Sequence, residues 1–378
     1  MGSAVNTSKF VLSSDRGTEL YLTLTDPAGA DAEAQVVELF SEAGAALREG
    51  GAHAFQERVF VGAEAAGAVA SARARGYGAA ADELPPTVLL NPAGAPAALQ
   101  VHAVGGPDRP ELLRWDGRPA GRVLRTGGRT YAALSGLVDP TAGDAARQAG
   151  RVYEAAEAVL ARAGADLRSV VRTWVWLGDI LDWYDAFNAV RNGFFRRRGL
   201  TGAGAERAPH LPASTGIGVR PLPAPGRDGR PACALDVLAV VGEDGAAEFL
   251  PAAGRQQSPW AYGSAFSRAA VAETPGGRTV WVSGTAAIDA DGASCRVGDP
   301  HGQIEMTLAN VRAVLAAAGC RDADVVQAVA YCKTPDVLAL WRADDAGADW
   351  PCASVLSDVC RPELLFEVEA TACVAGGP

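Results

Sequence analysis

An internal repeat constrains the fold of this chain more than any other feature of its sequence. The segment AVLARAG at 158–164 matches AVLAAAG at 313–319, and the similarity continues on both sides of each segment. A unit of roughly 120 residues therefore occurs at 120–243 and again at 260–375. Repetition at a fixed period indicates that each copy is one structural unit packed on its neighbours.

Both units predict the same order of elements. A strand is followed by a long amphipathic helix that ends at a glycine, then by a second strand, a second helix and two closing strands. This order is typical of an α+β fold with helices on one face of a mixed sheet. The predicted elements are strands at 129–135 and 278–283, helices at 143–164 and 302–319, strands at 170–177 and 325–332, and helices at 181–198 and 335–345.

The first 115 residues follow the same order without matching at the residue level. Strands are expected at 19–25 and 56–61, and helices at 32–50 and 63–75. We therefore expect three units: a divergent one at 1–117, a central one at 118–250 and a C-terminal one at 251–378. One third of 378 residues is close to the repeat length, which favours a pseudo-trimeric body, with 244–260 as the linker into the last unit.

Composition excludes several classes of function. A net charge of −10 leaves no general basic surface for nucleic acid or anionic membranes. The seven cysteines form no CxxC pair and the four histidines share no metal-ligand spacing, so neither a metal nor a cofactor is expected. The first twenty residues lack an apolar core and no run of 18 apolar residues occurs, which predicts a cytoplasmic protein.

The segment at 358–371 predicts a closing strand with two different faces. Leu364, Phe366 and Val368 fall on one face, which packs on the helices, and Glu367 and Glu369 fall on the other. The two carboxylates are either solvated side chains or line a cleft. In a cleft, an apolar surrounding would keep one of them protonated as a general acid.

Two further patterns allow a structural and a functional interpretation. Trp183, Phe187 and Arg191 share a face of the predicted helix, and Tyr184 and Asn188 also neighbour Arg191. This face is either an aromatic stripe packed in the core or an aromatic pocket in which the arginine binds a ligand carboxylate. The small-residue segments PASTGIG at 212–218 and SGTAAI at 283–288 indicate tight strand packing or backbone that approaches a ligand closely.

Six segments of the chain are informative when they are taken together. They are WVWLGDI…Y..FN..RN.FF (174–195), PASTGIG (212–218), YGSAFSRA (262–269), SGTAAI (283–288), GDP..Q….L.N (298–310) and DVCRPELLFEVEA (358–370). In this order and spacing they resemble the chorismatases, enzymes built on the Rid (YjgF-type) fold. The resemblance covers about 120–375, whereas the N-terminal 115 residues carry no matching motif.

Chorismatases cleave the enolpyruvyl ether of chorismate, and the resemblance implies chorismate as a small-molecule substrate. It implies that Glu367 protonates the enolpyruvyl methylene, that Arg191 binds one carboxylate and that Arg342 or Arg361 binds the other. Asp236 is expected at the position of Glu367 in the preceding repeat, which would leave one working site. The remaining expected substrate-binding residues are Tyr184, Ser214, Thr215, Tyr262, Thr285 and Ala287.

Two positions bear on the identity of the ring product, and they indicate different products. Cys360 resembles the aromatising members of the family, which give 3-hydroxybenzoate, and would act in catalysis. Ala287 resembles the hydrolytic members, which give a dihydroxycyclohexadiene carboxylate. We expect 3-hydroxybenzoate.

Two alternatives to a chorismatase are an imine deaminase and a non-catalytic binding protein of the same fold. The deaminases place an arginine on the strand before the closing glutamate, where this chain has Ala353. Fusion of the units into one chain makes a monomer plausible.

Overall fold

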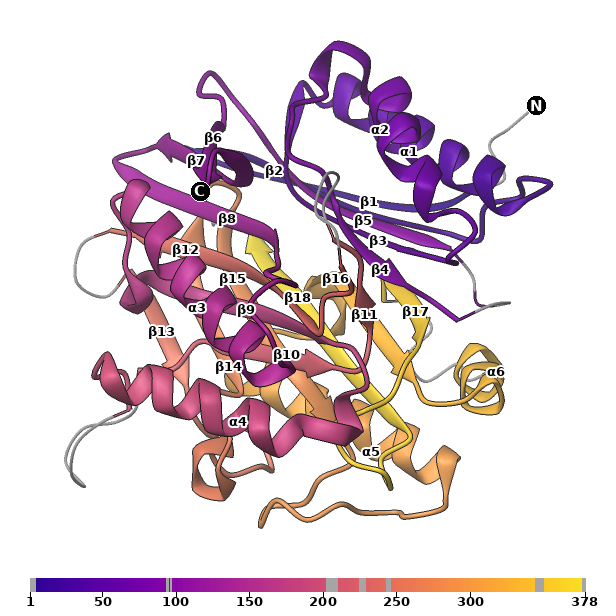
Figure 1. Ribbon diagram of the computed structural model, residues 1–378, viewed down its shortest axis with the longest axis vertical. Helices are drawn as coiled ribbons and strands as arrows, with labels where there is room; N and C mark the ends of the chain where they lie inside the picture. The colour runs from indigo at the N-terminus through magenta and orange to yellow at the C-terminus, as the bar shows by residue number, and fades with distance from the viewer. Residues whose placement is uncertain are drawn as a thin grey trace.

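The computed structural model describes residues 5–92, 95, 97–201, 210–223, 229–242, 246–343 and 350–375. Within these ranges the chain forms three six-stranded mixed sheets and six α-helices. Figure 1 shows how these elements are arranged. The predicted α+β fold of repeated units is confirmed. The pseudo-trimeric arrangement and the three unit boundaries stay predictions.

The first sheet belongs to the N-terminal unit, and its order is β1-β2-β5-β3-β4-β11. The helices α1 (Ala32–Glu49) and α2 (Val69–Tyr77) cover one of its faces (Figure 1). The final strand, β11, comes from the central unit and pairs with β4, so the two units share a sheet. The strands are β1 (Asn6–Ser14), β2 (Gly17–Thr25), β3 (Ala52–Val61), β4 (Thr87–Leu90), β5 (Ala98–Gly105) and β11 (Arg220–Pro221).

The second sheet has the order β10-β9-β12-β8-β7-β6 and packs on two helices of the central unit. Every element predicted for this unit is present. The strands are β6 (Glu111–Trp115), β7 (Arg118–Thr126), β8 (Arg129–Leu137), β9 (Val170–Leu177), β10 (Ala213–Ile217) and β12 (Cys233–Val241), and the helices are α3 (Ala145–Arg162) and α4 (Ile180–Arg197).

The third sheet has the order β13-β14-β15-β18-β16-β17 and packs on α5 (Pro300–Ala317) and α6 (Pro335–Ala343). Its edge strand β13 lies inside the segment expected to be a linker, because Ala247–Leu250 pairs with β14. The linker prediction is therefore wrong there. The strands are β13 (Ala247–Leu250), β14 (Ala269–Thr274), β15 (Gly277–Ala286), β16 (Val325–Cys332), β17 (Cys352–Leu356) and β18 (Phe366–Ala375).

The two repeats end their long helices in the same way. Gly164 and Gly319 follow α3 and α5 with φ of +76° and +77°, a backbone conformation that a residue with a side chain rarely adopts. At the other end, the side chains of Asp144 and Asp299 accept hydrogen bonds from the first turn of each helix. These caps explain why both helices could be located from the sequence.

The faces of the sheets that point away from the helices meet in one shared core. Phe60, Trp176 and Tyr331 are buried there, one from each sheet. Polar side chains also bind between sheets: Gln56 Nε2 donates to the Leu134 carbonyl at 3.2 Å, and Gln327 Nε2 donates to the Leu22 carbonyl at 3.0 Å. Each sheet therefore contacts both of the others.

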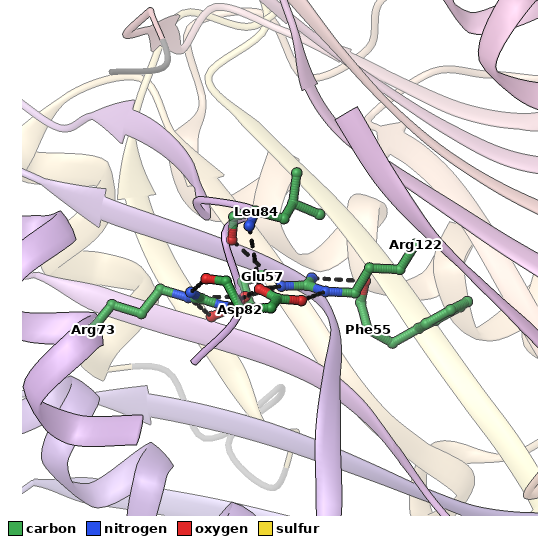
Figure 2. Close-up of polar contacts among 6 residues, drawn as sticks. All are labelled: Phe55, Glu57, Arg73, Asp82, Leu84 and Arg122. Atoms are coloured by element: carbon green, nitrogen blue, oxygen red, sulfur yellow. Dashed lines mark hydrogen bonds and ion pairs between the residues drawn. The ribbon is translucent and has the colours of Figure 1, made fainter. Parts of the chain in front are cut away.

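A buried network of four charged groups joins the N-terminal unit to the central unit (Figure 2). Glu57 on β3 accepts from Arg73 of α2 at 2.8 Å and from Arg122 of β7 at 3.0 Å. Asp82 binds both guanidinium groups, and Arg122 also donates to the carbonyl of Phe55 at 3.1 Å. Because Arg122 belongs to a different sheet from Glu57, the network fixes the position of one sheet on the other.

We expect Arg122→Met to lower the free energy of unfolding by about 3–5 kcal/mol, because the change leaves Glu57 buried with one partner fewer. Urea unfolding measures the change. Arg114→Met is the matched control, since Arg114 pairs with Glu83 at the exposed surface and should cost less than about 1 kcal/mol. Equal losses in the two variants would contradict a stabilising role of the network.

Candidate active site

A pocket of about 510 Å³ lies between the second and third sheets. One wall comes from α4 and β10 of the central unit. The other comes from β15, β18 and the segments that precede β14 and β18 in the C-terminal unit. The lining residues are Tyr184, Arg191, Ser214, Gly216, Tyr262, Ser264, Phe266, Arg268, Gly284, Ala286, Ile288, Cys360, Arg361 and Glu367.

The closing strand β18 has the two faces that its sequence predicts. Phe366 and Val368 are fully buried in the core against the helices of the C-terminal unit. Glu367 and Glu369 occupy the opposite face, and Glu367 lines the pocket with an exposed fraction of 5%. The interpretation of these glutamates as solvated side chains is therefore wrong.

Gly284 on β15 makes room for the carboxyl group of Glu367. A Cβ atom at position 284 would lie 2.1 Å from Glu367 Oε1, a distance at which one of the two groups must move. Ala286 lies directly opposite Glu367 in the ladder between β15 and β18 and also lines the pocket. Small residues at 284 and 286 therefore hold the space in which the carboxyl group meets a ligand.

The surroundings of Glu367 favour its neutral form. Burial, followed by the nearby charge of Glu369, raises the pKa of Glu367 to about 8, and Arg172 and Arg268 oppose this rise. The group is consequently mostly protonated at neutral pH, and the structure gives it the property that a general acid requires.

Three arginines surround the same pocket, and within the described part of the chain each donates to neutral acceptors. Arg191 donates to Asn188 Oδ1 at 2.6 Å, and its Nε is buried with no hydrogen-bond partner among the described residues. Arg268 donates to Tyr262 Oη at 2.7 Å, and Arg361 donates to Ser294 Oγ at 3.1 Å.

Arg191 and Arg268 both lie near the aromatic ring of Phe266, with their guanidinium carbons 5.6 and 5.8 Å from its centroid. With Glu367 protonated, the three arginines give the pocket a positive charge, which suits a ligand with several negative charges.

Seven of the residues predicted from the sequence line this pocket together. They come from four separate segments of the central and C-terminal units, which the fold brings side by side. These residues are Tyr184, Arg191, Ser214, Tyr262, Cys360, Arg361 and Glu367.

Four other predicted residues do not line the pocket. Thr215 stands behind the wall, where its hydroxyl binds Arg172 at 2.6 Å and the backbone N–H of Gly284 at 3.0 Å. Thr285 near the end of β15 and Ala287 just beyond it are buried, and neither belongs to the pocket lining, which takes Gly284, Ala286 and Ile288 from this segment. Arg342 lies on α6 and pairs with Asp26 at 2.9 Å, so its assignment to a substrate carboxylate is wrong.

Sequence reasoning missed Arg268 and Phe266. Both belong to the segment YGSAFSRA, of which only Tyr262 was selected as a ligand contact. The alternation of Ser264, Phe266 and Arg268 toward one side could have indicated them, since all three line the pocket. Burial lowers the pKa of Arg268, with Tyr262 acting in the opposite direction.

The strand ladders correct the position expected for Asp236. Asp236 pairs with Trp174 on β9, and Glu369 pairs with Val329, which the repeat aligns with Trp174. Asp236 is thus the counterpart of Glu369, and the counterpart of Glu367 is Ala234. Asp236 is fully buried and accepts from Thr87 at 2.8 Å, Gly136 at 2.6 Å and Trp176 at 3.0 Å, so it is a structural carboxylate.

The described residues contain no group of three or more histidine, cysteine, aspartate or glutamate side chains arranged to hold a metal ion. Among them, no helix combines the length and the apolar character that crossing a membrane would require.

Comparison with known proteins relates both repeats to one family. The family model described as Endoribonuclease L-PSP matches residues 122–228 and again 257–374, together more than half of the chain. No relative was found among curated proteins.

Solved structures give a similar result. A chorismatase is similar over 78% of this chain and 88% of its own, with a TM-score of 0.57 and 21% identity, which shows a shared fold. A Rid-family protein of unknown function from Yersinia pestis is 35% identical over 29% of this chain and 86% of its own, with a TM-score of 0.24. RidA from the Antarctic bacterium Psychrobacter sp. is 23% identical over 29% and 88%, also with a TM-score of 0.24.

The raised pKa of Glu367 predicts a pH-dependent cost to stability. Between its ordinary pKa of 4.5 and about 8, the unfolded chain loses this proton while the folded chain keeps it, so stability falls as the pH rises through this range. We expect Glu367→Gln to remove this loss and to be the more stable protein above pH 8, by at most about 5 kcal/mol.

Thermal unfolding of both proteins between pH 5 and pH 9 measures the difference, which should shrink toward pH 5. Glu248→Gln, a change at an exposed position of β13, is the control and should follow the unmodified protein. A difference that does not depend on pH would contradict the assignment.

Proposed function

Because the chain belongs to the Endoribonuclease L-PSP (Rid/YjgF) family, we propose that it uses this fold as a chorismatase, an enzyme that releases pyruvate from chorismate. The observation that carries the proposal is the combination of a buried Glu367, whose pKa is raised to about 8, with three arginines that form no ion pair among the described residues. Chorismate is a dianion with an acid-labile enol ether, so it needs both features at once.

Binding of the substrate follows from the positive charge of the pocket. Arg191 belongs to α4 and Arg268 to the segment before β14, so two guanidinium groups reach the pocket from different walls, both near the ring of Phe266. We assign Arg191 to one carboxylate of the substrate and Arg268 or Arg361 to the other. Guanidinium groups bind carboxylates through two parallel hydrogen bonds, which also fixes the orientation of the ring.

Proton transfer from Glu367 starts the reaction. An enol ether is a weak base, so the acid must be held against the methylene carbon in a site from which water is largely excluded. Protonation of that carbon produces an oxocarbenium ion at the ether carbon, and the carboxylate left on Glu367 stabilises this cation. Water can then attack the oxocarbenium carbon and form a hemiketal, which collapses to pyruvate and the ring alcohol. Alternatively, the neighbouring ring hydroxyl attacks the ring carbon that bears the ether, so that the ring C–O bond breaks, pyruvate leaves as the keto acid and the hydroxyl proton returns to Glu367; loss of a ring proton from the resulting epoxide then gives the aromatic product.

The identity of the attacking oxygen decides the ring product, and Cys360 is placed to influence it. Burial, followed by the nearby Glu367, raises the pKa of the Cys360 thiol to about 12. The thiol is therefore neutral at physiological pH and acts as a weak donor beside the reacting ring. We propose attack by the ring hydroxyl and 3-hydroxybenzoate as the product, which requires no net water. Attack by water would give the dihydroxycyclohexadiene carboxylate.

The imine deaminase alternative needs an arginine on the strand before β18, and position 353 holds a fully buried alanine. A cytoplasmic enzyme that acts as a monomer, without nucleic acid or membrane partners, remains our expectation from composition and from the fusion of the units.

Incubation of the purified protein with chorismate should release pyruvate, measured with a coupled dehydrogenase assay. We expect Glu367→Gln to reduce turnover by at least about 100-fold, because general acid catalysis of this kind contributes roughly that factor or more. Arg268→Met should raise KM by about 10-fold or more, and Arg342→Met, which removes an arginine outside the pocket, should leave KM unchanged. Release of ammonia from an imino acid without pyruvate would favour the deaminase alternative.

Separation of the ring products by chromatography tests the role of Cys360. We expect Cys360→Ala to increase the share of dihydroxycyclohexadiene carboxylate, because the added space admits water beside the ring. Cys352→Ala removes a thiol outside the pocket and serves as the control. An unchanged product ratio in Cys360→Ala would show that the thiol has no part in product selection.

A further inference from the structure

We propose that the N-terminal unit completes the active site, with Arg58 and Glu369 as a positioning pair that controls whether Glu367 keeps its proton. The proposal rests on the function assigned above to Glu367. It gives the first 115 residues, which carry no matching motif, a role in the chemistry of a site located between the other two units.

Glu369 connects the strand that carries Glu367 to the first and second sheets. It follows Glu367 by two residues on the same strand face, so their Cα atoms are about 6.6 Å apart. Its carboxylate accepts from Arg172 at 2.8 Å, from Trp174 Nε1 at 2.7 Å and from Arg58 at 3.4 Å. Two guanidinium groups and an indole N–H thus surround the carboxylate of Glu369, the group whose charge acts on Glu367.

Arg58 is the residue of the N-terminal unit that binds Glu369. It comes from β3, and its guanidinium carbon lies 3.9 Å from the ring centroid of Trp174, with that of Arg172 at 4.6 Å from the same ring. The side chains of Arg58 and Glu369 are about 95% buried, so the attraction between them is screened little by solvent. One cation of the N-terminal unit thereby offsets part of the charge beside the catalytic glutamate.

The network in Figure 2 holds β3 from its other face. Glu57, the neighbour of Arg58, points to α2 and is bound there by Arg73 and Arg122. Successive residues of a strand face opposite sides, so this network fixes β3 while Arg58 reaches into the shared core. The placement of Arg58 is therefore built into the junction between the first two units.

Charged and titratable groups face Glu367 from all sides of the site. Glu369 disfavours its ionisation, and Arg172 of β9 and Arg268 ahead of β14 favour it. Arg58 acts on Glu367 through Glu369. The other groups around the pocket and behind it are Tyr184 and Arg191 of α4, Tyr262, Tyr331 of β16, Cys360 and Arg361.

The geometry predicts shifts of opposite sign for the two members of the pair. Glu369→Gln removes the negative charge and leaves Arg172 and Arg58 uncompensated, so Glu367 should lose its proton at lower pH. Arg58→Met keeps an unbranched chain over Trp174 but removes the cation, so Glu369 is offset less and Glu367 should keep its proton to higher pH. Arg58→Lys retains the cation and should behave like the unmodified protein.

The experiment uses the full chain and two readouts. The first is the pH profile of kcat/KM for pyruvate release, whose basic limb reports loss of the proton from the essential acid. The second is infrared titration of the carboxyl C=O stretch, assigned to Glu367 by its absence in Glu367→Gln. We expect Glu369→Gln to lower both midpoints by about one pH unit or more and Arg58→Met to raise both by about half a unit.

A third arginine variant serves as the control. Arg16→Met removes another arginine of the N-terminal unit that binds the C-terminal unit, through Glu273 at 2.8 Å at the partly exposed surface, and should leave both midpoints unchanged. Arg58→Gln is the second variant if Arg58→Met does not fold, and the same upward shift is expected.

Unmoved midpoints in both Glu369→Gln and the Arg58 variant would overturn the proposal, as would shifts of the same sign. If the protein released no pyruvate, the proposed function would fail, and the infrared titration would still decide whether Arg58 and Glu369 control Glu367.

Discussion

The carboxylate of Glu369 is the contact on which the arrangement of the three sheets depends. It is contributed by the third sheet and receives hydrogen bonds from Arg172 and Trp174 of the second sheet and from Arg58 of the first. A buried charge of this kind is stable only when its partners are in place, so any displacement of one sheet leaves a charged group without compensation. The three sheets are therefore held in one relative arrangement. This arrangement also fixes the positions of the walls of the pocket between the second and third sheets.

Two glutamates on one face of one strand have opposite roles because their partners differ. Glu369 is surrounded by cations and donors, whereas Glu367 faces Gly284, Ala286 and the pocket. A carboxyl group without donors is kept neutral by burial, and a charged neighbour strengthens this effect. Asp236 extends the comparison, since three hydrogen bonds hold it in the central unit where no ligand reaches it.

Local sequence patterns predicted the helices and most strands of both repeats, because glycine C-caps and the alternation of strand residues depend on nearby residues. The resemblance to the chorismatases, and not these patterns, implied that Glu367, Arg191 and Cys360 share a site. Local patterns could not show which residue of β12 corresponds to Glu367 of β18. Bulges in the ladders of β12 shift its register, and Asp236 consequently lies opposite Trp174. Arg342 and Arg268 could not be distinguished from the sequence, because their partners, Asp26 and Tyr262, depend on how distant segments pack.

The ladder positions equivalent to Glu367 hold Ala98 in the first sheet and Ala234 in the second. An assembly of three identical subunits would carry the acid at every interface. The free-energy cost of burying the carboxyl group would then arise at three sites and not at one. In a single chain, each unit has its own sequence. The acid can therefore be retained at one junction, while the other two junctions carry residues that only stabilise the fold. Each of the three junctions can then change in sequence independently of the other two, and only one of them carries the buried, unpaired carboxyl group that the proposed reaction needs.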